Sequence, residues 1–417
     1  MFKKLSGLYY GWHMVGASAA VRLLGAGLHS YGFTVFFLPL SQELHLSRTA
    51  TSFAFSLARA EGAIEGPIIG HLLDRYGPRP VMLVAVSLMG IGYLLLSQVQ
   101  SYWSFVLVYT VLISFTHAGG FMHAPMTLIN TWFIRWRARA MTVNSAAYGL
   151  GGVLIAPVLS MIVHSWGWRW GAAFAGITFL TIGIPLCLTI RRSPEGMGLL
   201  PDGESQQAFE VRTGDAQAKS EVEITPRQAM RSFAFWALVF GAGVRNASYH
   251  AISTHFIPMM IWKGMSPQQA TFLLSAFAFL GFTSTVMLGW LADSMNKPRM
   301  ISAILFLAGG SILLPIFGTS MASLLLFTLL FTTVEATYPV AWAMVGDIFG
   351  RKHFAKIRGY MSMFYVWGSV AGPVITGAIW DRWHTYEPMF WGLVVMFCLS
   401  GIFYSLLGKS WVRPRAV

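Results

Sequence analysis

Residues 70–79 read Gly70-His71-Leu72-Leu73-Asp74-Arg75-Tyr76-Gly77-Pro78-Arg79, and the spacing of its first glycine and its aspartate recurs in Gly289-Trp290-Leu291-Ala292-Asp293, 219 residues later. The same offset aligns six further identical pairs: Phe37 and Phe256, Pro39 and Pro258, Ser47 and Ser266, Phe53 and Phe272, Ser56 and Ser275, and Gly62 and Gly281. Identity at one unbroken offset is typical of a duplicated chain. The sequence therefore predicts two halves of related structure, with a binding site where they meet.

The composition indicates a chain that lies in a lipid bilayer. Of its 417 residues, 55% are hydrophobic and 11% are charged, whereas soluble domains carry about 25% charged residues. An apolar run of about 20 residues is long enough to cross a ~30 Å hydrocarbon core. Such runs lie near 11–38, 49–73, 80–98, 103–131, 141–164, 170–190, 234–261, 268–292, 300–317, 321–345, 360–380 and 389–408. These predict an all-α membrane protein with twelve transmembrane helices in two pseudo-symmetric six-helix bundles.

The loops between these spans carry the positive charge unevenly. With a cytoplasmic N-terminus, 22 lysines and arginines fall on the cytoplasmic side and four on the outer side. Because cationic loops resist translocation, both termini are predicted to be cytoplasmic, in a plasma membrane or, in a bacterium, the inner membrane. The net charge of +13 is dispersed over these short loops, so the basic residues favour membrane topology over nucleic-acid binding.

The composition breaks once, in a polar, acidic stretch near the middle of the chain. Residues 193–226 have too little apolar surface to form a core, which predicts a mobile cytoplasmic linker. We place an N-terminal six-helix half at 1–192, the linker at 193–230 and a C-terminal half at 231–417. Cys187 and Cys398 each lie alone in an apolar span, so neither a disulfide nor a metal site is expected. No cofactor is expected either.

The segment 70–79 resembles the signature loop of the major facilitator superfamily, and its weaker copy at 289–293 stands where the duplication requires it. With the twelve spans and the central linker, this resemblance covers essentially the whole chain. It implies a conformational latch at the cytoplasmic side, in which Asp74 meets a helix N-terminus and nearby cations bind facing acids. The residues assigned to the latch are Gly70, Asp74, Arg75, Gly77, Arg79 and Asp293.

The second span carries a glycine at every fourth position. Gly62, Gly66 and Gly70 form a flat stripe on which a neighbouring backbone can approach closely. The plain interpretation of this stripe is helix packing.

Two further segments resemble one branch of the superfamily. Tyr9-Tyr10-Gly11-Trp12 and the run 132–140 look like the monocarboxylate transporter and oxalate:formate antiporter branch. This resemblance implies a carrier of a small organic anion that is coupled to a proton or a counter-anion, and we expect a functional monomer. The chain departs from the branch in the eighth helix, where Gly281 and Thr285 stand at the positions of an Asp and an Arg in animal monocarboxylate transporters.

Arginines inside the spans are the first candidate site residues, because an ionisable group at mid-membrane costs about 2.5–3.5 kcal/mol and must face a cavity or a partner. Arg22 and His29 are seven residues apart on the first helix, hence on one face. The resemblance aims Arg22 and Arg245 at the central axis, where two guanidinium groups make an anion site. The alternative for Arg22 is a structural ion pair with Glu61 or Glu65.

Glu335 is the acid best placed for proton coupling. A carboxyl in an apolar cavity has its charged form disfavoured and can take up a proton near neutral pH. Glu335, Tyr338 and Trp342 share one face of the tenth helix. The alternative is that Glu335 serves as the fixed counter-ion of Arg245. Glu61 and Glu65 join the proton-coupling set, although their position beside the glycine stripe favours interhelical ties.

The predicted substrate-binding set comprises Arg245, Arg22, His29, Tyr31, His123, Tyr338, Trp342 and Tyr249. Together these features predict a secondary transporter of a small organic anion, most simply a monocarboxylate. The alternatives are a carrier of neutral or cationic molecules and a membrane sensor that binds a ligand without moving it. An enzyme is not expected, because nothing resembles a nucleophile and base pair, a metal cluster or a cofactor loop.

Overall fold

The computed structural model describes residues 9–44, 65–203 and 224–407. By the contacts among its residues the chain forms two compact units, each of which is described by itself. The first comprises residues 1–223 together with 350–359, and the second comprises 224–349 and 360–417. The boundary at 223 falls inside the linker predicted at 193–230, and the assignment of the domains to those ranges stays a prediction.

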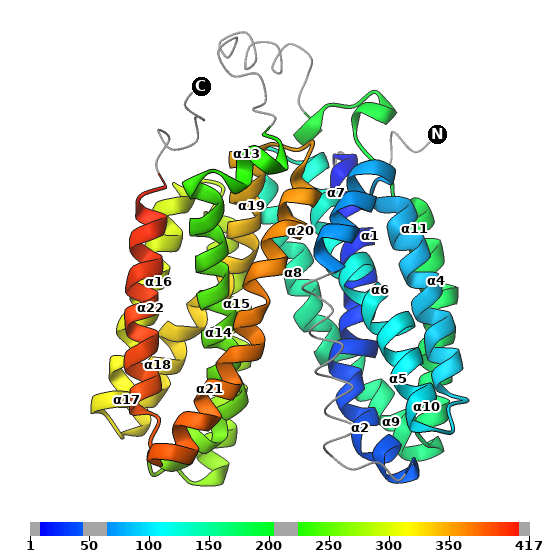
Figure 1. Ribbon diagram of the computed structural model, residues 1–417. Helices are drawn as coiled ribbons and strands as arrows, with labels where there is room; N and C mark the ends of the chain where they lie inside the picture. Colours follow the sequence, from blue (N-terminus) through cyan, green and yellow to red (C-terminus); the bar gives the residue numbers. More distant parts are fainter. Residues whose placement is uncertain (1–8, 45–64, 204–223, 408–417) are drawn as a thin grey trace, which may run out of the picture. The chain divides into compact units, whose positions relative to one another are not determined.

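The first unit is built from helices that follow one another along the chain (Figure 1). Several of them are interrupted by π-helical segments. They are α1 (Tyr10–Gly25), η1 (Ala26–Tyr31) and α2 (Gly32–Glu43); residues 65–76; α4 (Pro78–Leu96); α5 (Tyr102–Leu107), η2 (Val108–Ser114), α6 (Phe115–His117), η3 (Ala118–His123) and α7 (Ala124–Trp132); α8 (Arg137–Leu154) and α9 (Ala156–Trp166); and α10 (Trp168–Thr178), η4 (Phe179–Gly183) and α11 (Ile184–Thr189).

The second unit repeats this pattern of long helices (Figure 1). They are α13 (Pro226–Met230), α14 (Phe233–Trp262), α15 (Pro267–Leu291), α16 (Lys297–Ser311), α17 (Leu313–Phe317), α18 (Met321–Phe331), η7 (Thr332–Ala336), α19 (Thr337–Phe349), α20 (Phe354–Tyr365), α21 (Trp367–Trp383) and α22 (Glu387–Ser405). The first residues of α20 belong to the first unit.

The described helices confirm the predicted fold class. Each half of the sequence supplies six long helical stretches, and no strand occurs among the described residues. Within those residues, nine helices are long and apolar enough to cross a membrane by length and composition. Turn chemistry explains where they begin: Ser266 accepts the N–H of Gln269 at the start of α15, and Gly77 takes a φ of 85° that lets the chain turn into α4.

The first helix differs from the prediction in its register. Residues 26–31 are π-helical, and a π turn holds more residues than an α turn, so it rotates every side chain that follows. Arg22, before the π segment, donates to Asn144 of α8, whereas His29, within it, meets Tyr93 of α4. Arg22 and His29, which were predicted to share one face, thus have hydrogen-bond partners on different helices.

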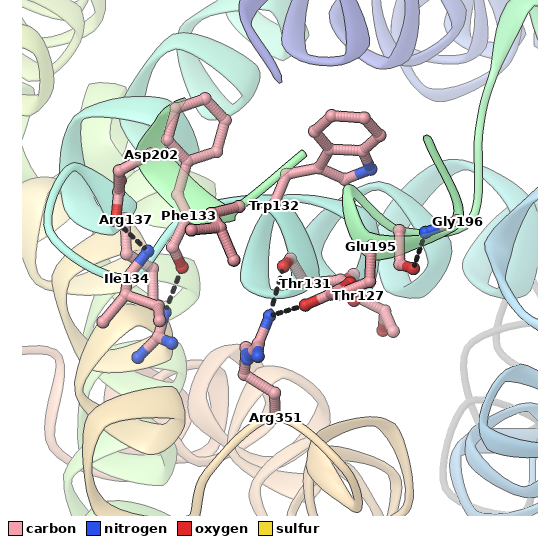
Figure 2. Close-up of polar contacts among 12 residues, drawn as sticks. Thr127, Thr131, Trp132, Phe133, Ile134, Arg137, Glu195, Gly196, Asp202 and Arg351 are labelled. Atoms are coloured by element: carbon pink, nitrogen blue, oxygen red, sulfur yellow. Dashed lines mark hydrogen bonds and ion pairs between the residues drawn. The ribbon is translucent and has the colours of Figure 1, made fainter. Parts of the chain in front are cut away.

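The start of the linker also differs from the prediction. Residues 193–203 form two 3₁₀ turns, η5 (Glu195–Met197) and η6 (Pro201–Gly203). The Asp202 carboxylate accepts the backbone N–H groups of Ile134, Arg135 and Trp136 at 2.9, 2.7 and 3.2 Å. Figure 2 shows the contact with Ile134. Polar contacts to backbone groups hold this stretch, which the sequence argument missed because it counted apolar surface alone.

Candidate functional site

A partly buried ion pair joins α14 to η7 in the second unit. Nη2 of Arg245 lies 2.9 and 2.8 Å from the two carboxylate oxygens of Glu335. The two side chains are only 14% and 22% exposed. Burial costs both charges their hydration, which a pair with this geometry offsets in part. The structure thus pairs Arg245, which was predicted as an anion ligand, with Glu335, which was predicted as a proton carrier. This is the arrangement of the alternative in which Glu335 is the counter-ion of Arg245.

The rest of the Arg245 guanidinium is held by polar and aromatic neighbours. Nη1 donates to Oδ1 of Asn246 at 2.9 Å, and Nε is buried without a hydrogen-bond partner. The guanidinium carbon lies 5.0 Å from the ring centroid of Tyr338 and 5.7 Å from that of Tyr249, which is within cation–π range. Of the predicted binding residues, Tyr338 and Tyr249 therefore contact Arg245 directly.

A cavity opens beside this arginine, within the second unit. It encloses about 440 Å³ of empty space, including space open to the outside, and Arg245 and Asn246 form part of its wall. The predicted residues Tyr338 and Trp342 also line it. Tyr365 and Tyr404 complete the aromatic lining, and sequence reasoning missed them because no pattern relates their helices to α14.

Gly281 of α15 lies against the acidic partner of the ion pair. A Cβ atom at Gly281 would lie 3.6 Å from Cγ of Glu335, an ordinary van der Waals contact. Gly281 stands at the position at which animal monocarboxylate transporters carry an aspartate. The carboxylate of Glu335 thus lies near the place where those transporters have their own carboxylate, although it comes from a different helix.

Arg22, in the first unit, is only 3% exposed and is bound by polar side chains. Its Nη1 donates to Oδ1 of Asn144 at 2.9 Å, and the amide of Asn144 donates to Oγ of Ser18 at 3.1 Å. The guanidinium carbon also lies 5.6 Å from the ring centroid of Tyr148. Asn144 and Ser18 were missed, although Ser18 stands one helical turn before Arg22 and could have signalled this polar face.

The other predicted residues of the first unit are spread over several contacts. Nδ1 of His29 lies 3.0 Å from the hydroxyl of Tyr93. Tyr31 is 42% exposed, and its ring lies 5.6 Å from that of Tyr148. His123 is buried, and its carbonyl oxygen accepts the hydroxyl of Thr127. The ring of Tyr148 contacts both Tyr31 and the guanidinium of Arg22. The role of these residues in binding stays a prediction.

Glu65 ties two segments of the first unit together. Its carboxylate accepts the backbone N–H of Gly119 in η3 at 2.8 Å, and the side chain is 2% exposed. This contact is the interhelical tie that the sequence favoured for Glu65. Glu61 lies outside the described residues.

The segment 70–79 packs against residues 350–359, which belong to the same unit. The Asp74 carboxylate accepts the backbone N–H groups of Ala355 and Lys356, in the first turn of α20, and His353 Nδ1 lies 3.9 Å from it. Burial raises the pKa of Asp74 to about 7, against the opposing effects of the Lys356 charge and the two N–H groups. Asp74 meets a helix N-terminus, as the resemblance implied.

The glycine stripe allows this contact. A Cβ atom on Gly70 would lie 2.5 Å from the carbonyl oxygen of Ala355, and one on Gly359 would collide with the carbonyl oxygen of Gly66. The two backbones therefore approach in a way that only glycine permits, which agrees with the packing interpretation of the stripe. Arg358, 1% exposed, adds hydrogen bonds to the carbonyls of Met122 and His123 at 3.0 and 3.1 Å.

The remaining residues assigned to the latch have local contacts. The Arg75 guanidinium lies over the ring of Tyr76, the Arg192 side chain packs on Gly77, and the Nε atom of Arg79 is buried. In the second unit, Asp293 lies 3.9 Å from Nζ of Lys297, which in turn pairs with Asp347 at 2.8 Å.

A second contact of residues 350–359 was not predicted. Nη1 of Arg351 donates to the carbonyl oxygen of Thr131 at the end of α7 and to the carboxylate of Glu195, each at 3.0 Å (Figure 2). Glu195 belongs to the ordered start of the linker, so the linker and residues 350–359 share one polar cluster. No sequence spacing links these residues, because the contact depends on the fold of the linker.

Comparisons with known proteins agree with this architecture. A family model described as the Major Facilitator Superfamily matches residues 19–333 and 251–416. Monocarboxylate transporter 2 of Mesocricetus auratus is 25% identical over 98% of this chain and 87% of that protein. Monocarboxylate transporter 11 of Homo sapiens is 24% identical over 89% of this chain and 78% of that protein. Among solved structures, the E. coli fucose:proton symporter matches with a TM-score of 0.72 at 13% identity, over 95% and 98% of the two chains.

Proposed function

The chain belongs to the major facilitator superfamily of membrane transporters, and from this premise we propose that it carries a monocarboxylate anion that binds Arg245 and is coupled to a proton on Glu335. The observation that carries the proposal is that Arg245 lines a cavity and that its Nη2 contacts both carboxylate oxygens of Glu335. The substrates named in its monocarboxylate relatives support the choice of anion. Both termini are proposed to face the cytoplasm.

The coupling follows from the electrostatics of the pair. With Glu335 ionised, its carboxylate occupies the arginine, and an incoming anion must compete with it. A proton on Glu335 neutralises the carboxyl group and leaves the arginine as an uncompensated charge in a poorly hydrated site. A substrate carboxylate can then take the place of Glu335 and use the Nε–H group that has no partner. Proton and anion thus favour one another, which supports proton symport and also permits anion exchange.

A ligand comparison tests the proposal. Purified protein is expected to be stabilised against heat by monocarboxylates and not by their amides, by sugars or by cationic drugs, because a ligand stabilises the folded state that binds it. Stabilisation by neutral or cationic compounds with none from carboxylates would replace this proposal with the neutral or cation carrier.

The contact of Asp74 with α20 is proposed to act on cycling and not on binding. The pKa of Asp74 in the contact is about 7, well above the ordinary 3.8, so the contact holds the proton more tightly than the separated segment does. The contact should therefore strengthen as the pH falls through about 7 and weaken as it rises. Asp74→Asn, which is uncharged at every pH, is expected to slow transport and to change ligand affinity by less than about threefold.

Two measurements check this prediction. Hydrogen exchange of residues 354–358, corrected for intrinsic rates, should slow in the parent protein as the pH falls from 8 to 6, and Asp74→Asn should remove that dependence. Asp293→Asn is the comparison variant for the exchange measurement: its aspartate contacts Lys297, so the exchange of residues 354–358 should keep its pH dependence. Unchanged transport rates and exchange in Asp74→Asn would show that the contact is merely structural.

A further inference from the structure

The cavity beside Arg245 extends along two helices. On α14 its wall runs from Arg245 back through Gly241 to Leu238, and on α19 it runs from Tyr338 through Trp342 to Val345. Each stretch covers eight residues, and at a rise of 1.5 Å from one residue to the next the cavity follows the helices for roughly 10 Å. Arg245 contacts Tyr338, so the charged group lies at the start of both stretches. A ligand bound by its carboxylate would direct its other end between the two helices.

The lining beyond the arginine is apolar and aromatic. The aliphatic and ring-bearing residues in the wall are Leu238, Ile301, Leu305, Val345, Met361, Tyr338, Trp342, Tyr365 and Tyr404. Trp342 and Tyr404 are 3% and 2% exposed, and the ring of Trp342 lies 5.7 Å from that of Tyr365 and 6.0 Å from that of Tyr338. Such tilted and edge-on rings favour contact with a flat apolar group.

Apart from Arg245, the polar groups of the wall are uncharged: the hydroxyls of Tyr338, Tyr365 and Tyr404, the indole N–H of Trp342, the hydroxyl of Thr337 and the amide of Asn246. The hydroxyl of Thr337 donates to the carbonyl oxygen of Val334 at 2.6 Å, and the amide oxygen of Asn246 accepts from Arg245. Among the described residues that line the cavity, Arg245 is the only charged one. A second carboxylate on the ligand would lie among uncharged side chains with no cation to pair with it, and its burial would cost desolvation free energy.

From this lining we infer that the substrate is a monocarboxylate with a bulky apolar body, such as an aromatic ring two or three carbons from the carboxylate, and that dicarboxylates are excluded. The inference rests on the proposed function for the carboxylate end. It adds that the apolar part of the substrate is bound by the apolar wall that α14, α19 and their neighbours form.

One glycine sets the width of the cavity. A Cβ atom on Gly241 would collide with the ring of Tyr404, which is buried on α22. A methyl group at residue 241 must displace the ring of Tyr404. The empty space beside the ring is the cavity, so the displaced ring is expected to narrow it. Gly243, on the same helix, has open space where a Cβ atom would stand, with only the Tyr365 backbone 4.0 Å away. Gly241→Ala and Gly243→Ala thus form a matched pair of variants, of which only Gly241→Ala brings a methyl group into collision with the ring of Tyr404.

Titration calorimetry of the purified protein with four ligands tests the inference. We expect 3-phenylpropionate to bind about 10- to 150-fold more tightly than propionate, the effect of burying one ring. Phenylsuccinate, which adds a carboxylate, should bind at least about tenfold more weakly than 3-phenylpropionate. Gly241→Ala should weaken 3-phenylpropionate by about tenfold or more and leave propionate within about threefold, and Gly243→Ala should change neither.

The outcomes separate the two proposals. Equal affinity for propionate and 3-phenylpropionate, or equal loss of both in Gly241→Ala, would overturn the apolar body and leave the carboxylate site standing. If 3-phenylpropanamide bound as tightly as 3-phenylpropionate, the carboxylate site itself would be overturned. Tight binding of phenylsuccinate would overturn the exclusion of dicarboxylates.

Discussion

Replacing Arg245 with lysine is expected to weaken carboxylate binding by about 1.5–3 kcal/mol, roughly 10- to 150-fold, the scale of a hydrogen bond to a charged group. Lysine keeps the positive charge but loses the planar fork, which in the parent protein contacts Glu335 and Asn246 at once. Arg245→Ala should weaken binding further. Equilibrium binding and uptake of a radiolabelled monocarboxylate measure both variants.

Arg169 offers a matched control for this substitution. It forms an ion pair of the same length, 2.8 Å, with Glu43, and this pair is more exposed and belongs to the first unit. Arg169→Lys should leave carboxylate affinity unchanged. If Arg245→Ala binds and transports carboxylates like the parent protein, the anion site fails and a carrier of neutral or cationic molecules takes its place.

Replacing Glu335 with glutamine is expected to abolish the pH dependence of uptake while exchange of substrate at equal pH on both sides survives. Glutamine cannot carry the proton, and exchange requires no net proton movement. Glu65→Gln is the comparison variant, because Glu65 is also a buried acid but is occupied by the N–H of Gly119. A normal pH profile in Glu335→Gln would assign coupling to Glu61, Glu65 or a histidine.

Gly281 provides a rescue of that variant. Its Cβ position lies in ordinary contact with Cγ of Glu335, so an aspartate there carries a carboxylate into the same neighbourhood from α15. Gly281→Asp in the Glu335→Gln background is therefore expected to restore part of the pH dependence. If Glu335 had only a structural role, Gly281→Asp would not restore the pH dependence, since residue 335 would still pack as glutamine.

The helices were predictable from the sequence because apolar runs of membrane length leave few alternatives. The duplication and the segment 70–79 then gave the family, which is confirmed. The meeting of Asp74 with a helix N-terminus followed from the same resemblance, but the identity of its partners, Ala355 and Lys356, required coordinates.

The residues of the candidate site were harder to predict from the sequence than the helices were. Arg245 and Glu335 stood out because charge is costly inside a membrane, and their pairing was one of two alternatives. Tyr404 and Tyr365 could not be recognised, because a tyrosine in an apolar helix gives no sign of which neighbour it faces. The π segment at 26–31, which contains His29, could not be predicted either, since it depends on packing rather than on local sequence.

The pair of Arg245 and Glu335 has a consequence for the electrical behaviour of the transporter. In the empty site the two charges cancel, and they cancel again when Glu335 holds a proton and Arg245 holds a carboxylate. Moving one uncompensated elementary charge across the bilayer is worth about 2.3 kcal/mol per 100 mV. A site that is neutral in both forms carries no net charge in either direction. Transport through it is therefore expected to generate no current and to respond to concentration gradients while remaining indifferent to membrane voltage.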